Sequence, residues 1–99
     1  MLDNLRFIKY VRSFMDGRVR LRHPALRDGR VARLTRDGIA VIPGVLSVEV
    51  NSLSGSALLQ YDSRQLSRDQ LMRLGVAWAV WLDDARSGHI GPLPQAGAD

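Results

Sequence analysis

The spacing of apolar residues switches between two periods along this chain, and the order of the switches restricts the folds open to it. Residues 18–22 read Arg-Val-Arg-Leu-Arg, a strict alternation that predicts a strand with Val19 and Leu21 buried. From about Asp28 the apolar residues recur at helical spacing, until Pro43-Gly44 ends the pattern. Alternation returns in residues 46–50 and 57–61, and the turn at Ser54-Gly55 between them predicts a hairpin.

A second helix is expected after this hairpin. Ser67 and Gln70 have the spacing of a capping box, and an apolar face follows until about residues 84–87. The order strand, helix, strand, strand, helix predicts an α+β protein of the ferredoxin-like, split βαβ type, with two helices on one face of an antiparallel sheet. Its fourth strand is doubtful or replaced, because the candidate at residues 89–93 is short and broken by Gly and Pro.

The chain has the length of one domain, which we expect to span residues 17–87. Residues 88–99, rich in Gly, Pro and Ala, are expected to trail off it as a flexible tail. Residues 1–16 are expected to pack on the domain in one of two ways. Residues 5–14 fit a strand folded back at Asp16-Gly17, and they also fit a short helix with Leu5, Ile8, Val11 and Met15 aligned.

Two stretches carry a resemblance to a known family. Residues 42–71, IPGVLSVEVNSLSGSALLQYDSRQLSRDQL, and residues 17–26, GRVRLRHPAL, resemble heavy-metal-associated domains. The chain looks like the cysteine-free branch of that family. The resemblance implies a place beside or within P-type metal-transporting ATPases, some of them linked to iron.

Metal binding is where the chain departs from the family. Members that carry metal do so with an MxCxxC loop between the first strand and helix, whereas this chain has HPALRDGR at residues 23–30 and no cysteine anywhere. Without thiolates a copper(I) site is not expected. His23 and Asp28 are the weak candidates for another metal, but two ligands make an incomplete site. The alternative is that His23 ends a strand and Asp28 caps the first helix.

Charge is distributed unevenly. Residues 1–36 carry a net charge of +7 and residues 37–99 a net charge of −3, and thirteen of the fourteen basic residues are arginine. Alternation places Arg18, Arg20 and Arg22 in a row on the open face of the predicted sheet, where they form a candidate surface for an acidic partner. The alternative is a cross-strand lattice of ion pairs with Glu49 that only keeps the face soluble.

Trp81 is the other candidate for partner binding. The second helix is apolar nearly all round, so Trp81 either covers the monomer core or anchors an interface, and we expect the interface. This apolar helix and the unfilled sheet edge together predict a homo-oligomer, with a dimer as the simplest case.

These observations predict a non-enzymatic binding or regulatory module in metal homeostasis, acting with a protein partner that the resemblance suggests is a membrane metal-transporting ATPase. The alternatives are a metal carrier using His23 and acidic side chains, or a phosphate or nucleic-acid binder. Nucleic acid is disfavoured because the open face lacks aromatic platforms. We expect no cofactor, no catalytic residues and no membrane span, since the longest apolar run covers only residues 74–82. Cytoplasmic location is the default for a chain without a visible signal peptide.

Overall fold

The computed structural model of the protein describes residues 2–94. Its helices are α1 (Leu2–Ile8), α2 (Gly29–Ala40) and α3 (Arg68–Arg86), with a short 3-10 helix, η1 (Pro24–Arg27), before α2. Its strands are β1 (Val11–Met15), β2 (Arg18–Arg22), β3 (Val45–Asn51) and β4 (Ser56–Tyr61). The predicted strand, helix, hairpin and second helix are therefore all present, in the predicted order.

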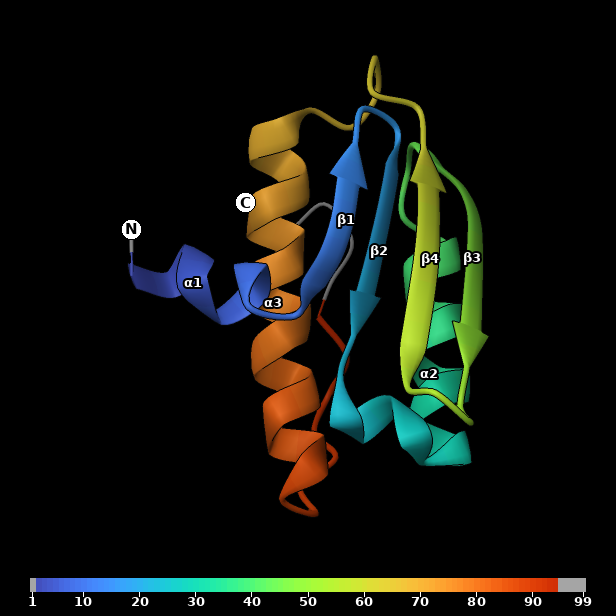
Figure 1. Ribbon diagram of the computed structural model, residues 1–99, viewed down its shortest axis with the longest axis vertical. Helices are drawn as coiled ribbons and strands as arrows, with labels where there is room; N and C mark the ends of the chain where they lie inside the picture. The colour runs from blue at the N-terminus through green and yellow to red at the C-terminus, as the bar shows by residue number, and fades with distance from the viewer. Residues whose placement is uncertain (1, 95–99) are drawn as a thin grey trace.

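The strands form one antiparallel sheet in the order β1-β2-β4-β3. Figure 1 looks onto its open face, and α2 and α3 lie behind it. The sequence therefore predicted the fold class correctly, an α+β fold with two helices on one face of an antiparallel sheet. Val19, only 1% exposed, points from β2 toward the helices, and Leu21 packs against the same core.

The place of the fourth strand beside β2 is filled by β1, from the N-terminal segment. Gly17, with a φ of 83°, makes the turn between β1 and β2, and its carbonyl accepts a hydrogen bond from the Tyr61 N–H at 3.0 Å. The two alternatives for residues 5–14 occur in succession, because α1 ends at Ile8 and β1 begins at Val11. The predicted helical face is wrong, since Leu5 and Ile8 are exposed and Phe7 is the buried residue.

The predicted helix caps are present. The Asp28 carboxylate accepts hydrogen bonds from the N–H groups of Arg30 and Val31 at the start of α2. Ser67 and Gln70 form a reciprocal capping box at the start of α3. Both caps satisfy N–H groups that the first turn of a helix leaves without partners.

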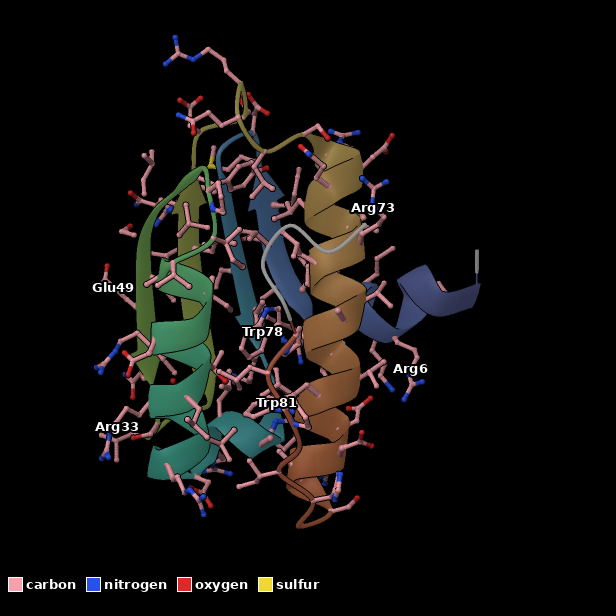
Figure 2. All side chains as sticks on the ribbon, turned by 180° about the vertical axis from the view of Figure 1, so that it is seen from behind. Arg6, Arg33, Glu49, Arg73, Trp78 and Trp81 are labelled. Atoms are coloured by element: carbon pink, nitrogen blue, oxygen red, sulfur yellow. The ribbon has the colours of Figure 1, made fainter. Side chains whose placement is uncertain are left out.

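Residues 90–93, beyond α3, pack on the core, where the sequence had suggested a tail. Ile90 and Leu93 contact the main hydrophobic cluster, and the Gly91 carbonyl accepts a hydrogen bond from the Trp81 indole at 3.1 Å. Figure 2 shows Trp81 and Trp78 between α2 and α3. The expectation that the chain leaves the domain at residue 88 is wrong for residues 88–94, and residues 95–99 lie outside the described residues.

Candidate functional site

The arginine row on β2 is the candidate site that the sequence indicated. Arg18, Arg20 and Arg22 are exposed, in alternation with Val19 and Leu21. Successive side chains on one face of a strand are about 7 Å apart, so the three guanidinium groups start from an evenly spaced row. β2 is an inner strand, paired with both β1 and β4, so the row runs down the middle of the open face.

The neighbouring strands surround this row with side chains that carry few charges. β4 places Ser56, Leu58 and Gln60 opposite the three arginines, and β1 places Ser13 opposite Arg20. Hydroxyl, amide and apolar side chains of this kind leave the positive charge of the guanidinium groups uncompensated. The row is therefore a basic stripe whose paired residues on β1 and β4 are uncharged.

Glu49 does not neutralise the stripe. It lies on β3 opposite Leu58, which in turn lies opposite Arg20, so two strand spacings of about 4.8 Å separate Glu49 from the stripe. Arg20 and Glu49 line the same shallow depression, but no ion pair within residues 2–94 joins Glu49 to an arginine. The structure therefore does not form the alternative that the sequence left open, a cross-strand lattice of ion pairs between the arginines and Glu49.

His23, the candidate metal ligand, is fully buried and both of its ring nitrogens are engaged. Nδ1 accepts a hydrogen bond from the Ala25 N–H at 3.0 Å, so the ring proton is on Nε2, which donates to Asp83 Oδ1 at 2.8 Å. Burial lowers the pKa of His23 and outweighs the opposing effect of the Asp83 carboxylate. The imidazole is therefore neutral near pH 7 and has no lone pair left for a metal ion.

Asp83 joins three separate parts of the chain around His23. Oδ1 accepts a second hydrogen bond, from the Tyr10 hydroxyl at 2.5 Å, and Oδ2 accepts a longer one from Arg6 at 3.4 Å. Burial works against ionisation of Asp83, but the hydrogen bonds from Tyr10 and His23 prevail and lower its pKa. Burial and the same carboxylate raise the pKa of Tyr10 to about 12.

Sequence reasoning missed this cluster of His23, Asp83 and Tyr10. Tyr10 and Asp83 are 73 positions apart, and His23 and Asp83 are 60 apart, so no local spacing links them. The one available signal was the position of Asp83 directly after the apolar run of residues 74–82, because a half-buried carboxylate needs hydrogen-bond donors. The cluster serves the fold, since it ties α3 to the end of β2 and to the turn before β1.

The donors of the 23–30 loop do not fit a metal ion. His23 and Asp28 bond to different partners, because Asp28 caps α2 while His23 is held by Asp83. Within the part of the chain that the structure describes, no three His, Cys, Asp or Glu side chains come together in a group that could hold a metal. The chain also contains no cysteine to supply a thiolate.

Trp81 is a core residue, which corrects its assignment to a partner surface. Its side chain is 5% exposed, its ring lies edge-on to Trp78 at 5.3 Å between centroids, and its indole N–H is bonded to Gly91. Of the predicted partner-binding residues, the three arginines alone face solvent.

Among residues 2–94, no helix is long and apolar enough to cross a bilayer.

Comparison with known proteins adds one family match. The model of the family described as heavy metal associated domain 2 matches residues 2–81, which includes the N-terminal α1 and β1. No curated protein and no solved structure matches the chain.

Proposed function

Because the chain belongs to the heavy metal associated domain 2 family, we propose that it is a non-enzymatic binding module of metal homeostasis that docks on an acidic protein surface through Arg18, Arg20 and Arg22. Membership of this family indicates a metal-related binding module. The partner we propose is a metal-transporting P-type ATPase, and the place of action is the cytoplasm. The module regulates or recruits its partner and does not carry the metal itself.

One observation carries this proposal: the three arginines stand on the face of the sheet that no helix covers (Figure 1), and none has an ion-pair partner among the described side chains of residues 5–94. Arginine presents a planar fork of donors that matches carboxylate geometry, and it is favoured over lysine where ion pairs form at interfaces. An evenly spaced row on a rigid inner strand suits a partner with several carboxylates in register.

The metal-carrier alternative loses its central residue. A metal carrier needs donor atoms that are free to bind the metal ion. Both ring nitrogens of His23 are already hydrogen-bonded inside the core. Freeing the imidazole would remove one of the hydrogen bonds to Asp83 and leave the buried Ala25 N–H without its acceptor. An unsatisfied buried group costs about 1–3 kcal/mol. The structure therefore supports protein docking better than metal transfer.

The test compares two variants that remove equal charge from opposite sides of the molecule. Arg18→Gln with Arg20→Gln reduces the stripe, whereas Arg30→Gln with Arg33→Gln changes α2 on the helical side, where Figure 2 shows Arg33. Tagged wild type and both variants are used to capture partners from lysate of the source cells after nuclease treatment. Captured proteins are identified by mass spectrometry.

We expect wild type and the α2 variant to retain a metal-transporting ATPase and the stripe variant to lose it. Binding should weaken as the salt concentration rises, because salt screens exposed ion pairs. It should stay selective for that partner, because complementary charges set the specificity of docking. Equal capture by all three proteins would show that the arginine row is only a solvated face.

A further inference from the structure

A basic cleft lies at the end of β2 and shares one residue, Arg22, with the arginine stripe. It has a volume of about 400 Å³ and is lined by five cationic side chains. These five come from different parts of the fold, namely the α1–β1 turn, β1, β2, η1 and α3, and they are Lys9, Arg12, Arg22, Arg27 and Arg86. A volume of this size is within the range of small-molecule sites.

Among residues 5–94, whose side chains the structure describes, no carboxylate lines the cleft. Within the same residues none of the five cations takes part in an ion pair. Asp83 contacts Tyr10, which lines the cleft, but its carboxylate already accepts hydrogen bonds from Tyr10, His23 and Arg6. Asp83 is therefore bonded to groups other than the five cations, whose positive charge is left for a ligand.

The wall of the cleft is held in place from behind. The Tyr10 ring packs on His23 with 4.2 Å between ring centroids, and its hydroxyl is bonded to Asp83. The Tyr10 carbonyl accepts the N–H of Arg22 at 2.9 Å, which fixes the backbone of two lining residues together. Lys9 Nζ lies 5.1 Å from the centre of the Tyr10 ring. The backbone positions of these cations are set by the fold before any ligand arrives.

We propose that this cleft binds a small polyphosphate-bearing molecule. Five cations around one small volume require several negative charges close together. A diphosphate or triphosphate supplies about three or four negative charges within a few ångströms, because near pH 7 each inner phosphate carries about one charge and the terminal phosphate up to about two. A carboxylate brings only one charge per group. Guanidinium groups bind phosphate oxygens in pairs, and four of the five cations are arginine.

The test uses inorganic tripolyphosphate as the probe, in calorimetric titration at low ionic strength without divalent cations. Arg27→Gln with Arg86→Gln removes two charges from the cleft, and both residues are exposed, so the fold is expected to persist. Arg18→Gln with Arg20→Gln removes the same charge from the stripe and serves as the matched control. Citrate and an oligoglutamate peptide are titrated in parallel, because they offer carboxylates in place of phosphates.

We expect one tripolyphosphate per chain, with affinity reduced about tenfold or more in the cleft variant and less than about threefold in the stripe variant. Equal weakening in both variants would overturn the proposal, since it would show attraction to overall charge and no site. Absence of saturable binding, or citrate or peptide binding as tightly as tripolyphosphate, would overturn it as well. The stripe variant should lose capture of the partner protein but still bind tripolyphosphate. Failure of one proposal can therefore be distinguished from failure of the other.

Discussion

His23 illustrates how burial decides the chemistry of a single residue. In the sequence it sits at the loop where related domains hold metal, and its residue type suits a ligand. In the structure its side chain is completely buried, and two hydrogen bonds fix its tautomer. Sequence reasoning correctly placed it at the end of a strand. It could not give the partner of His23, because Asp83 reaches it only after α3 has packed beside β2.

The lowered pKa of His23 predicts a loss of stability on mild acidification. The unfolded chain takes up a proton near the ordinary pKa of 6.5, whereas the folded protein resists protonation until a lower pH. Between these two pKa values the unfolded state binds more protons, so the free energy of unfolding falls as the pH decreases below about 6.5. The slope is at most about 1.4 kcal/mol per pH unit for one proton. Urea unfolding between pH 7 and pH 5 measures it.

Two variants separate His23 from the rest of the protein in this experiment. His23→Gln should lower stability at pH 7 and flatten the slope, because the titrating group is gone. His89→Gln, at an exposed position, should keep the wild-type slope. The pKa of Asp83 is lowered from 3.8, so its own contribution is present above about pH 3.8 and is lost only in stronger acid. A wild-type slope in His23→Gln would contradict the prediction.

At the scale of elements, the contact between α1 and α3 depends on a missing side chain. Phe7 is 6% exposed and packs directly on Gly75, where a Cβ atom would lie 2.6 Å from three carbons of the Phe7 ring. That distance is well inside van der Waals contact. A glycine inside an amphipathic helix is commonly unfavourable, and here it allows the N-terminal helix to approach α3 closely.

Gly75→Ala should therefore destabilise the protein by about 1–3 kcal/mol, because overpacking displaces Phe7. The matched control is Gly29→Ala at the start of α2, where an added Cβ meets no atom within 4 Å. That change should be neutral or stabilise the protein by up to about 1 kcal/mol, since alanine restricts the unfolded chain. Urea unfolding followed by circular dichroism compares them. The same loss in both variants would rule out the Phe7 contact as the cause.

The elements that sequence predicted well are those whose periodicity and caps agree. β2, α2, the β3–β4 hairpin and α3 each combine a clear apolar pattern with a turn or cap signal. The N-terminal segment carried a pattern compatible with helix and strand, and packing of Phe7 on α3 decides where one changes to the other. Residues 88–94 looked like a tail because Gly and Pro interrupt them. Their apolar side chains nevertheless cover Trp81 and the core.

At the scale of the whole molecule, the two reasons for expecting a homo-oligomer are both accounted for within one chain. β1 fills the edge beside β2 that seemed open. Trp81, which the sequence suggested as an interface residue, is buried in the core under residues 90–93. The open face and the basic cleft remain as the surfaces that suggest partners. Both are positively charged, which opposes pairing of identical copies through either of them.

Because the N-terminal segment completes the sheet, the domain should not fold without it. A chain beginning at Gly17 lacks β1 and α1, which leaves the β2 edge unpaired and removes Phe7 from α3. We expect loss of cooperative urea unfolding or aggregation. Leu5→Ser with Ile8→Ser in the full chain is the control, because these side chains are 59% and 47% exposed and should matter little, within about 0.5 kcal/mol. A cooperative transition of the shortened chain at the wild-type midpoint would contradict this.

The position of β1 in the chain also affects how the protein is made. β1 precedes β2 by only a short turn, so the two strands of this hairpin leave the ribosome together, before β4 and α3 have emerged. One edge of β2 can thus be paired locally while the nascent chain is still incomplete. A strand supplied after α3 would leave that edge exposed to neighbouring chains until the end of translation. The N-terminal strand therefore acts as a built-in guard against aggregation during synthesis.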